Sequence, residues 1–234
     1  MTSEERWLTA VWPFVRGSLP AAPARIVEVG CGPLGGFVPA LEQAGYEATG
    51  IDPEAPRGPA YQRAEFERCD MAGPVDAIVA CTSLHHVADL ARVLGLARNA
   101  LVPGGALVVV EWARERFDEM TARWCFSRLP EPGADPGWLA RRHAEWRVSG
   151  QPWDAYLESW ARAEGLHSGL DILNELDARF DCQAVGFGPY FFADLAGTSE
   201  ADEQAAIASG LIKANRIQYV GRREGHIPAE QRQR

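Results

Sequence analysis

The sequence predicts an α/β fold built around a mostly parallel β-sheet. Short apolar runs of strand length alternate with stretches of helical periodicity, which is typical of parallel strands joined by helices. A glycine-rich turn follows the first run, and acidic residues mark the carboxyl ends of three successive runs at Glu28, Asp52 and Asp70. These strand ends border one crevice in an open parallel sheet. The 234 residues suffice for one such domain with an insertion.

Charge and composition exclude several classes of protein. The net charge of −9 argues against general affinity for nucleic acid or anionic membranes, which requires clustered Lys and Arg. The best apolar run, Ala106–Val110, has only strand length, and no signal peptide is recognisable, so we expect a soluble cytoplasmic protein. The five cysteines are scattered without C-x-x-C spacing, which argues against disulfides and against a metal site.

The N-terminal segment, residues 1–20, is predicted to form a helix. Apolar side chains recur at helical spacing, namely Trp7, Leu8, Val11, Trp12 and Val15. Their simplest role is to pack against the rest of the domain. The alternative is a helical flap that covers a cofactor or substrate.

The first strand is predicted at Arg25–Val29, directly before the glycine-rich turn. The spacing G-x-G-x-x-G occurs at Gly30, Gly32 and Gly35, a weak signal by itself because glycine turns are common. Pro33 fits the first turn of a helix, which we expect over Leu34–Ala44. Glycine lets the backbone approach a ligand, and a helix N-terminus offers unpaired N–H groups. The segment therefore predicts a nucleotide-type cradle, with an ordinary strand-to-helix turn as the alternative.

The next two strands carry the other acidic residues. The second strand, Tyr46–Ile51, ends at Asp52, which follows Gly32 at the distance expected of an acid that binds ribose hydroxyls. A third strand is predicted at Ala64–Arg68 and leads into Asp70. Asp70 lies either at the same crevice or in the cap of the following turn.

Further motifs give the sequence a specific family resemblance. An acid at Glu28 before G-x-G, the segment Ser83–Val87 (S-L-H-H-V) after a predicted strand Val75–Cys81, and Leu101–Gly105 (L-V-P-G-G) before a strand Ala106–Glu111 occur in order. They resemble motifs of the class I S-adenosylmethionine (SAM) methyltransferases, in particular the type 11 branch. Leu34 departs from this pattern, because many members have glycine there.

The resemblance implies a Rossmann-like fold with SAM as its cofactor. In this fold a seven-stranded sheet is mostly parallel, and its last strand enters antiparallel between strands five and six. Strand six is expected at Phe180–Phe187 and the last strand at Asn215–Gly221. We treat residues 1–234 as a single methyltransferase domain.

An aromatic-rich helical insertion is predicted between strands five and six, over residues 113–165. Residues 112–165 hold six of the eight tryptophans, and Trp153, Tyr156, Leu157 and Trp160 follow helical spacing. Bulky aromatic residues can form the core of a small subdomain, or they can line an acceptor pocket under a lid. Both roles can hold together.

The family resemblance also implies positions for the cofactor. The backbone from Glu28 to Gly32 would hold the methionine part, Asp52 the ribose, and Cys81 and Thr82 would lie below the sulfonium. The full set of predicted cofactor residues is Glu28, Gly30, Cys31, Gly32, Asp52, Pro53, Asp70, Met71, Cys81, Thr82 and His86, of which Asp70 and Met71 would border the adenine.

Histidines are the predicted catalytic bases. Removing a proton from a weakly acidic acceptor needs a base, and an imidazole suits neutral pH. His85 follows strand four and could face the acceptor, while His143 and His167 lie in or just after the insertion. We predict His85 and His143 as catalytic residues. An amine acceptor, already nucleophilic when neutral, would need no dedicated base.

The predicted function is transfer of a methyl group from SAM to a small-molecule acceptor, on oxygen or nitrogen more than on carbon, by direct displacement. The expected assembly is a monomer or homodimer. One alternative is a protein of the same fold that binds SAM without methylating, or that uses the pocket for another reaction. A nicotinamide oxidoreductase is a further alternative, against which Glu28 and the His85-His86 segment argue.

Overall fold

The computed structural model of the chain describes residues 2–69, 73–131 and 137–224. Within these residues, seven strands form one sheet in the order β3-β2-β1-β4-β5-β7-β6. The strands are β1 (Arg25–Val29), β2 (Glu47–Ile51), β3 (Tyr61–Gln62), β4 (Val75–Cys81), β5 (Leu101–Trp112), β6 (Asp181–Gly188) and β7 (Arg216–Arg222). The predicted α/β fold class is confirmed.

The sheet is parallel except for its last strand. β1 pairs in parallel with β2 and β4, and β4 pairs in parallel with β5. β7 lies between β5 and β6 and pairs antiparallel with both, with Trp112 opposite Arg216. The predicted antiparallel insertion of the final strand is therefore confirmed.

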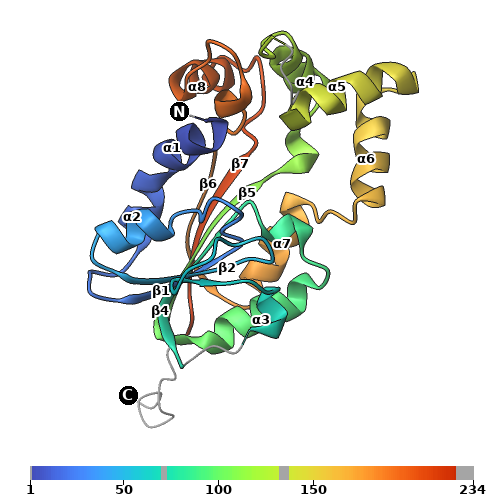
Figure 1. Cartoon of the computed structure of the whole chain (residues 1–234). Coiled ribbons are helices and arrows are strands. Elements are labelled where there is room, and N and C mark those ends of the chain that lie inside the picture. Colours follow the sequence, from blue (N-terminus) through green and yellow to red (C-terminus); the bar gives the residue numbers. More distant parts are fainter. Residues whose placement is uncertain (1, 70–72, 132–136, 225–234) are drawn as a thin grey trace, which may run out of the picture.

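Helices cover both faces of the sheet (Figure 1). On one face, α1 (Ser3–Ser18) and α2 (Val38–Gln43) pack over an apolar cluster that includes Val11, Val15 and Leu41. On the other face, α3 (Leu90–Ala100) and α7 (Gly169–Asp177) cover a second cluster. The apolar face predicted for residues 1–20 thus packs on the domain, and a Thr2–Glu5 capping box starts its helix.

Four further helices gather beyond the carboxyl end of β5 (Figure 1). The insertion contains α4 (Glu119–Phe126), α5 (Gly137–Ser149) and α6 (Trp153–Ala163), and α8 (Glu200–Ala208) precedes β7. A third apolar cluster joins them, with Trp124 and Trp153 from the insertion and Phe191 and Ala206 from the segment before β7. Most of the aromatic side chains of the insertion therefore form its own core. None of the helices in the described ranges is long and apolar enough to cross a membrane.

Two predicted elements are wrong in position. The third strand lies at Tyr61–Gln62, where Asp52 N–H donates to the Gln62 carbonyl, and not at Ala64–Arg68. Phe66–Arg68 instead forms a single 3₁₀ turn that buries the Phe66 side chain. The second helix begins at Val38 rather than Leu34, because Gly35 and Gly36 take φ values of +89° and +56° that an α-helix cannot accommodate.

Candidate active site

A cavity of about 700 Å³ opens at the carboxyl ends of β1, β2 and β4. Its walls come from the turn after β1, the residues after β2, the segment after β4 and the first turns of α1. The predicted cofactor residues that line it are Glu28, Gly30, Cys31, Gly32, Asp52, Pro53, Cys81, Thr82 and His86. Asp70 and Met71 lie outside the described residues. The sequence pattern and the fold thus bring the same side chains to one crevice.

The glycines of the turn after β1 are required by close contacts. A Cβ atom at Gly30 would lie 2.2 Å from the Cβ of Ser83, whose hydroxyl donates to the Val29 carbonyl. A Cβ at Gly36 would lie 2.4 Å from Oε1 of Glu28. Gly32 also has a positive φ of +63°, but no atom lies within 4 Å of its Cβ position. The backbone at Gly32 therefore remains open toward the cavity.

Glu28 is a buried carboxyl group in this turn. Its side chain is 1% exposed, and Oε2 accepts a hydrogen bond of 2.8 Å from the N–H of Phe37. Burial raises the pKa of Glu28 to about 8, although the N–H groups of Phe37 and Val38 act in the opposite direction. An N–H at the start of α2 is thereby satisfied by Glu28, where the sequence predicted that such groups would face a ligand.

Asp52 connects the first two strands at the edge of the cavity. One carboxylate oxygen accepts from Gly32 N–H at 3.1 Å, and the other accepts from Glu54 N–H at 2.7 Å. These bonds fix the carboxylate beside the glycine turn. Further lone pairs stay available to a ligand, because a carboxylate can accept about four hydrogen bonds.

The floor of the cavity is formed where β4 ends. Cys81 is buried, and burial raises the pKa of its thiol well above the ordinary value, so the sulfur is uncharged. Thr82 follows with a φ of +49°, a conformation that is unusual for a β-branched residue. Its N–H donates to the Val110 carbonyl at 2.8 Å. Strained backbone of this kind is frequent at functional sites.

His85 and Glu111 form a buried pair beside this floor. Nδ1 of His85 lies 2.7 Å from Oε2 of Glu111, and the side chains are 9% and 0% exposed. The other oxygen of Glu111 accepts from Leu84 N–H at 2.7 Å. Burial alone would lower the pKa of His85, but the charge and hydrogen bond of Glu111 raise it overall. The same contacts and nearby N–H groups lower the pKa of Glu111 in spite of its burial.

Glu111 was missed by the sequence reasoning. It stands near the carboxyl end of β5, the position relative to its strand that Glu28 occupies in β1. The signal was therefore available, because an acid at the end of a buried strand is unusual.

The histidines occupy different environments. His86 lines the cavity, and its ring centroid lies 4.1 Å from that of His85. Partial burial and the neighbouring His85 lower the pKa of His86, which keeps it neutral at pH 7. His143 stacks on Phe126 at 4.4 Å within the insertion, and Nε2 of His167 lies 2.9 Å from the Val87 carbonyl. Neither His143 nor His167 lines the cavity.

Aromatic rings lead from the cavity toward the insertion. Trp7 of α1 lines the cavity, and its ring meets that of Tyr190 edge to face at 6.2 Å. Tyr190 in turn stacks on Trp112 at 6.1 Å. Two backbone N–H groups of the Tyr190 segment donate to the buried carboxylate of Glu203, which fixes this segment against α8.

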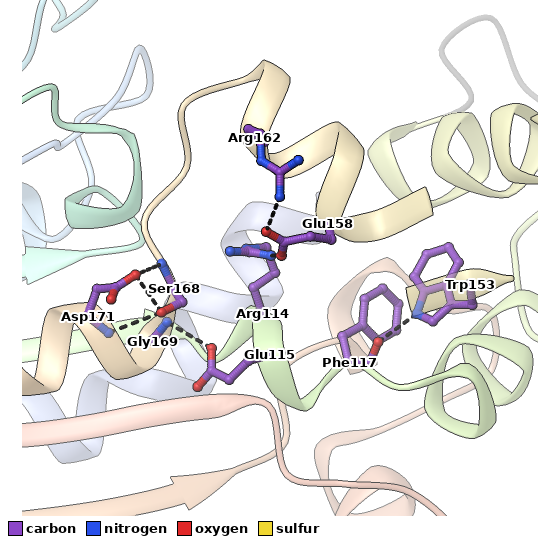
Figure 2. Close-up of polar contacts among 9 residues, drawn as sticks. All are labelled: Arg114, Glu115, Phe117, Trp153, Glu158, Arg162, Ser168, Gly169 and Asp171. Atoms are coloured by element: carbon purple, nitrogen blue, oxygen red, sulfur yellow. Dashed lines mark hydrogen bonds and ion pairs between the residues drawn. The ribbon is translucent and has the colours of Figure 1, made fainter. Parts of the chain in front are cut away.

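Polar contacts join the start of the insertion to its own last helix and to the start of α7 (Figure 2). Arg114, at its start, pairs with Glu158 of α6 at 3.0 Å, and Glu115 accepts from the N–H of Gly169 at the start of α7. The indole N–H of Trp153 donates to the Phe117 carbonyl at 2.6 Å. Trp153 is fully buried and belongs to the core of the insertion rather than to the cavity wall.

The sheet order, the acid before a glycine turn and the antiparallel seventh strand are those of the class I SAM-dependent methyltransferase fold. Residues 6–161 match the family profile described as a methyltransferase domain, and the chain belongs to this family. A sequence search of curated proteins gives no match.

Solved structures share the fold at low sequence identity. A SAM-dependent methyltransferase from Mesorhizobium loti is 21% identical, with a TM-score of 0.56, covering 92% of this chain and 98% of its own. A possible histamine N-methyltransferase from Thermotoga maritima is 16% identical, with a TM-score of 0.55 and coverages of 95% and 91%. Geranyl diphosphate C-methyltransferase from Streptomyces coelicolor is 15% identical, with a TM-score of 0.54 and coverages of 94% and 80%. Because the names of the last two give different methylated atoms, the fold leaves the acceptor open.

Proposed function

We propose that this methyltransferase acts on a small-molecule acceptor, on oxygen or nitrogen rather than carbon, by direct displacement. The observation that carries the proposal is the composition of the cavity, in which the acids of the strand ends meet the indole of Trp7. Its volume of about 700 Å³ falls within the range of small-molecule sites. The net charge of −9 disfavours nucleic acid as the acceptor.

The residues present fit SAM. The backbone from Glu28 to Gly32, open toward the cavity at Gly32, would hold the methionine part of the cofactor, and the buried carboxyl of Glu28 shapes this turn by accepting from Phe37 N–H. Asp52, with lone pairs beyond its two N–H donors, would accept from ribose hydroxyls, and Pro53 would border them. Cys81 and Thr82 would lie below the sulfonium. Asp70 and Met71 stay predicted neighbours of the adenine.

Bound SAM supplies a methyl group that leaves its sulfur as the acceptor's lone pair forms the new bond, so that S-adenosylhomocysteine is released. The main protein contribution to such a displacement is positioning. The rigid turn between Gly30 and Gly36 would provide it on one side, and the α1 wall with Trp7 on the other.

We assign to His86 the role of the base that accepts the proton of the acceptor. His86 lines the cavity, and its lowered pKa leaves an unprotonated imidazole able to accept a proton. His85, predicted as the base, is instead held by Glu111 with a raised pKa, so we propose that it positions His86 through ring contact. His143 has no place in this arrangement, because it stacks on Phe126 away from the cavity lining.

The surrounding elements have proposed roles of their own. Residues 1–20 would act as a flap, since Glu4, Trp7 and Leu8 line the cavity. Residues 113–165 would act as a lid whose aromatic core keeps it rigid. The five free cysteines support a reducing, cytoplasmic compartment. A monomer or homodimer remains the expected assembly.

Isothermal titration with S-adenosylhomocysteine, followed by transfer of labelled methyl from SAM to a panel of small alcohols, phenols and amines, tests this function. We expect micromolar binding and label on at least one acceptor. Label found on carbon, or only on nucleic acid or protein, would contradict the proposed acceptor class.

A further inference from the structure

The first turns of α1 present two particular side chains to the cavity. Glu4 and Trp7 are three residues apart, so they lie on one face of the helix, and both line the cavity. Their helix is fixed in place, because Arg6 donates to the carbonyls of Phe192, Ala193 and Thr198 at 2.7–3.2 Å. These bonds hold the first turns of α1, and with them Glu4 and Trp7, against the segment before α8.

The charge of the cavity is strongly one-sided. Among the described residues that line it, carboxyl groups are frequent, while Lys and Arg do not occur: the acids are Glu4, Glu28, Asp52, Glu54, Glu65 and Glu67. Of these, Glu28 has a pKa of about 8 and is largely protonated at pH 7, and Glu65 pairs with Arg68 at 3.1 Å. Glu28 and Asp52 are taken up by the proposed cofactor contacts. Glu4 stands on the α1 wall, where partial burial together with the charge of Glu5 raises its pKa. A cation beside Glu4 would act in the opposite direction and stabilise its ionised form.

The aromatic rings favour the same kind of ligand. Tryptophan is the residue type that interacts most strongly with cations through its ring face, and Trp7 lines the cavity. The rings of Tyr190 and Trp112 continue the aromatic surface behind Trp7. An anionic acceptor would meet both the carboxyl of Glu4 and the negative faces of these rings. A phenol would gain only the apolar contact.

We infer that the acceptor is an amine, cationic in solution and attached to an apolar body, which Glu4 and Trp7 recognise on entry. The inference rests on the proposed function and names the substrate class of the same cavity. His86 completes it chemically: the ammonium N–H transfers its proton to the unprotonated imidazole, and the nitrogen lone pair freed by this transfer becomes the nucleophile. The imidazolium later releases that proton to solvent.

Binding of four matched probes to the complex with S-adenosylhomocysteine tests the inference without turnover. Isothermal titration would use benzylamine, benzyltrimethylammonium, benzyl alcohol and benzoate, which share one aromatic body and differ in charge. We expect both cations to bind about tenfold more tightly than benzyl alcohol, and benzoate to bind most weakly. The inference fails if benzyl alcohol or benzoate binds as well as the cations.

A pair of variants on the same helical turn locates the effect. Glu4→Gln should weaken the cations about tenfold and leave benzyl alcohol unchanged. Glu5→Gln removes the same charge outside the cavity lining and retains a capping-box side chain, so it should change the affinities of the four probes far less than Glu4→Gln does. Equal effects of the two variants would overturn the role of Glu4. Failure of the wild-type protein to bind S-adenosylhomocysteine would instead contradict the proposed function itself.

Discussion

The carboxylate of Glu111 lies 2.7 Å from Nδ1 of His85, and both side chains are buried at the strand ends that border the cavity. Glu111 also accepts from the N–H groups of Leu84 and Trp112. This pair therefore fixes the segment after β4 to the end of β5, and with it the position of His86.

Removing one member of this pair should be costly. Glu111→Gln leaves His85 without its charge partner, and breaking a buried pair costs about 3–5 kcal/mol of unfolding free energy. Because the pKa of His85 is raised in the folded state, the stabilisation by the pair is complete below the ordinary histidine pKa. It is lost as the pH rises through the raised pKa of His85. Because the pKa of Glu111 is lowered in the folded state, the stabilisation by the pair is also lost as the pH falls through that lowered pKa. Urea unfolding of the wild type and variant should thus differ most between the ordinary pKa values of the two groups, and a constant difference from pH 4 to 9 would contradict the ion pair.

The burial of Glu28 leads to a second predicted pH effect, which comes from desolvation of a carboxyl group and not from an ion pair. Its pKa of about 8 in the folded protein exceeds that of an unfolded chain, so the folded state binds the extra proton. Stability should therefore fall by a few kcal/mol as pH rises from about 4.5 to 8. Glu28→Gln cannot ionise and should lose this component of the pH dependence while binding S-adenosylhomocysteine poorly. Thermal unfolding scans across this range measure it, and identical profiles for wild type and variant would refute the shift.

Two glycines of the turn should respond differently to alanine. Gly32→Ala meets no neighbouring atom, so its cost is the backbone strain of a positive φ, about 1 kcal/mol. Gly36→Ala carries the same strain and also forces a methyl against the Glu28 carboxyl, which adds about 1–3 kcal/mol. Chemical denaturation compares the two variants directly. Equal destabilisation would mean that Glu28 moves aside freely.

Asp52→Ala should weaken cofactor binding. The loss of charge-assisted bonds to two hydroxyls corresponds to about 1–3 kcal/mol in affinity for S-adenosylhomocysteine. Asp181→Ala, at the start of the edge strand β6 and outside the cavity lining, is the matched control. Titration calorimetry should separate them, and unchanged affinity in Asp52→Ala would reject the ribose role.

Trp153 should matter for stability and not for ligands. Trp153→Phe leaves the Phe117 carbonyl without its donor inside the insertion, at a cost of about 1–3 kcal/mol (Figure 2). Trp160→Phe, at a half-buried ring, should cost less. Both variants should bind S-adenosylhomocysteine as the wild type does. A binding defect in Trp153→Phe alone would return this residue to the site.

Much of the fold was predictable because apolar runs and strand-end acids are local signals. Val75–Cys81 reads as a buried strand from its residues alone, and Glu28 and Asp52 line the cavity as expected. The run Ala64–Arg68 was misassigned because alternating apolar residues suit both an extended strand and a single turn that buries Phe66. The start of α2 was missed because a periodic pattern does not reveal the φ of two consecutive glycines.

The rest of the site depends on contacts between distant segments. Nothing near His143 in sequence indicates that it stacks within the insertion, and nothing near His85 indicates that Glu111 holds it. Tyr190 reaches Trp7 only because Glu203 and Arg6 fix its segment from two sides. Such arrangements follow from packing, which local propensity does not determine.

The central place of β7 in the sheet has a consequence for synthesis on the ribosome. β5 has its hydrogen-bonding partner β4 on one side as soon as it emerges, but its other edge waits for Arg216–Arg222. A nascent chain that has emerged as far as the insertion therefore exposes a long apolar strand edge, which is the kind of surface that chaperones shield and that aggregation exploits.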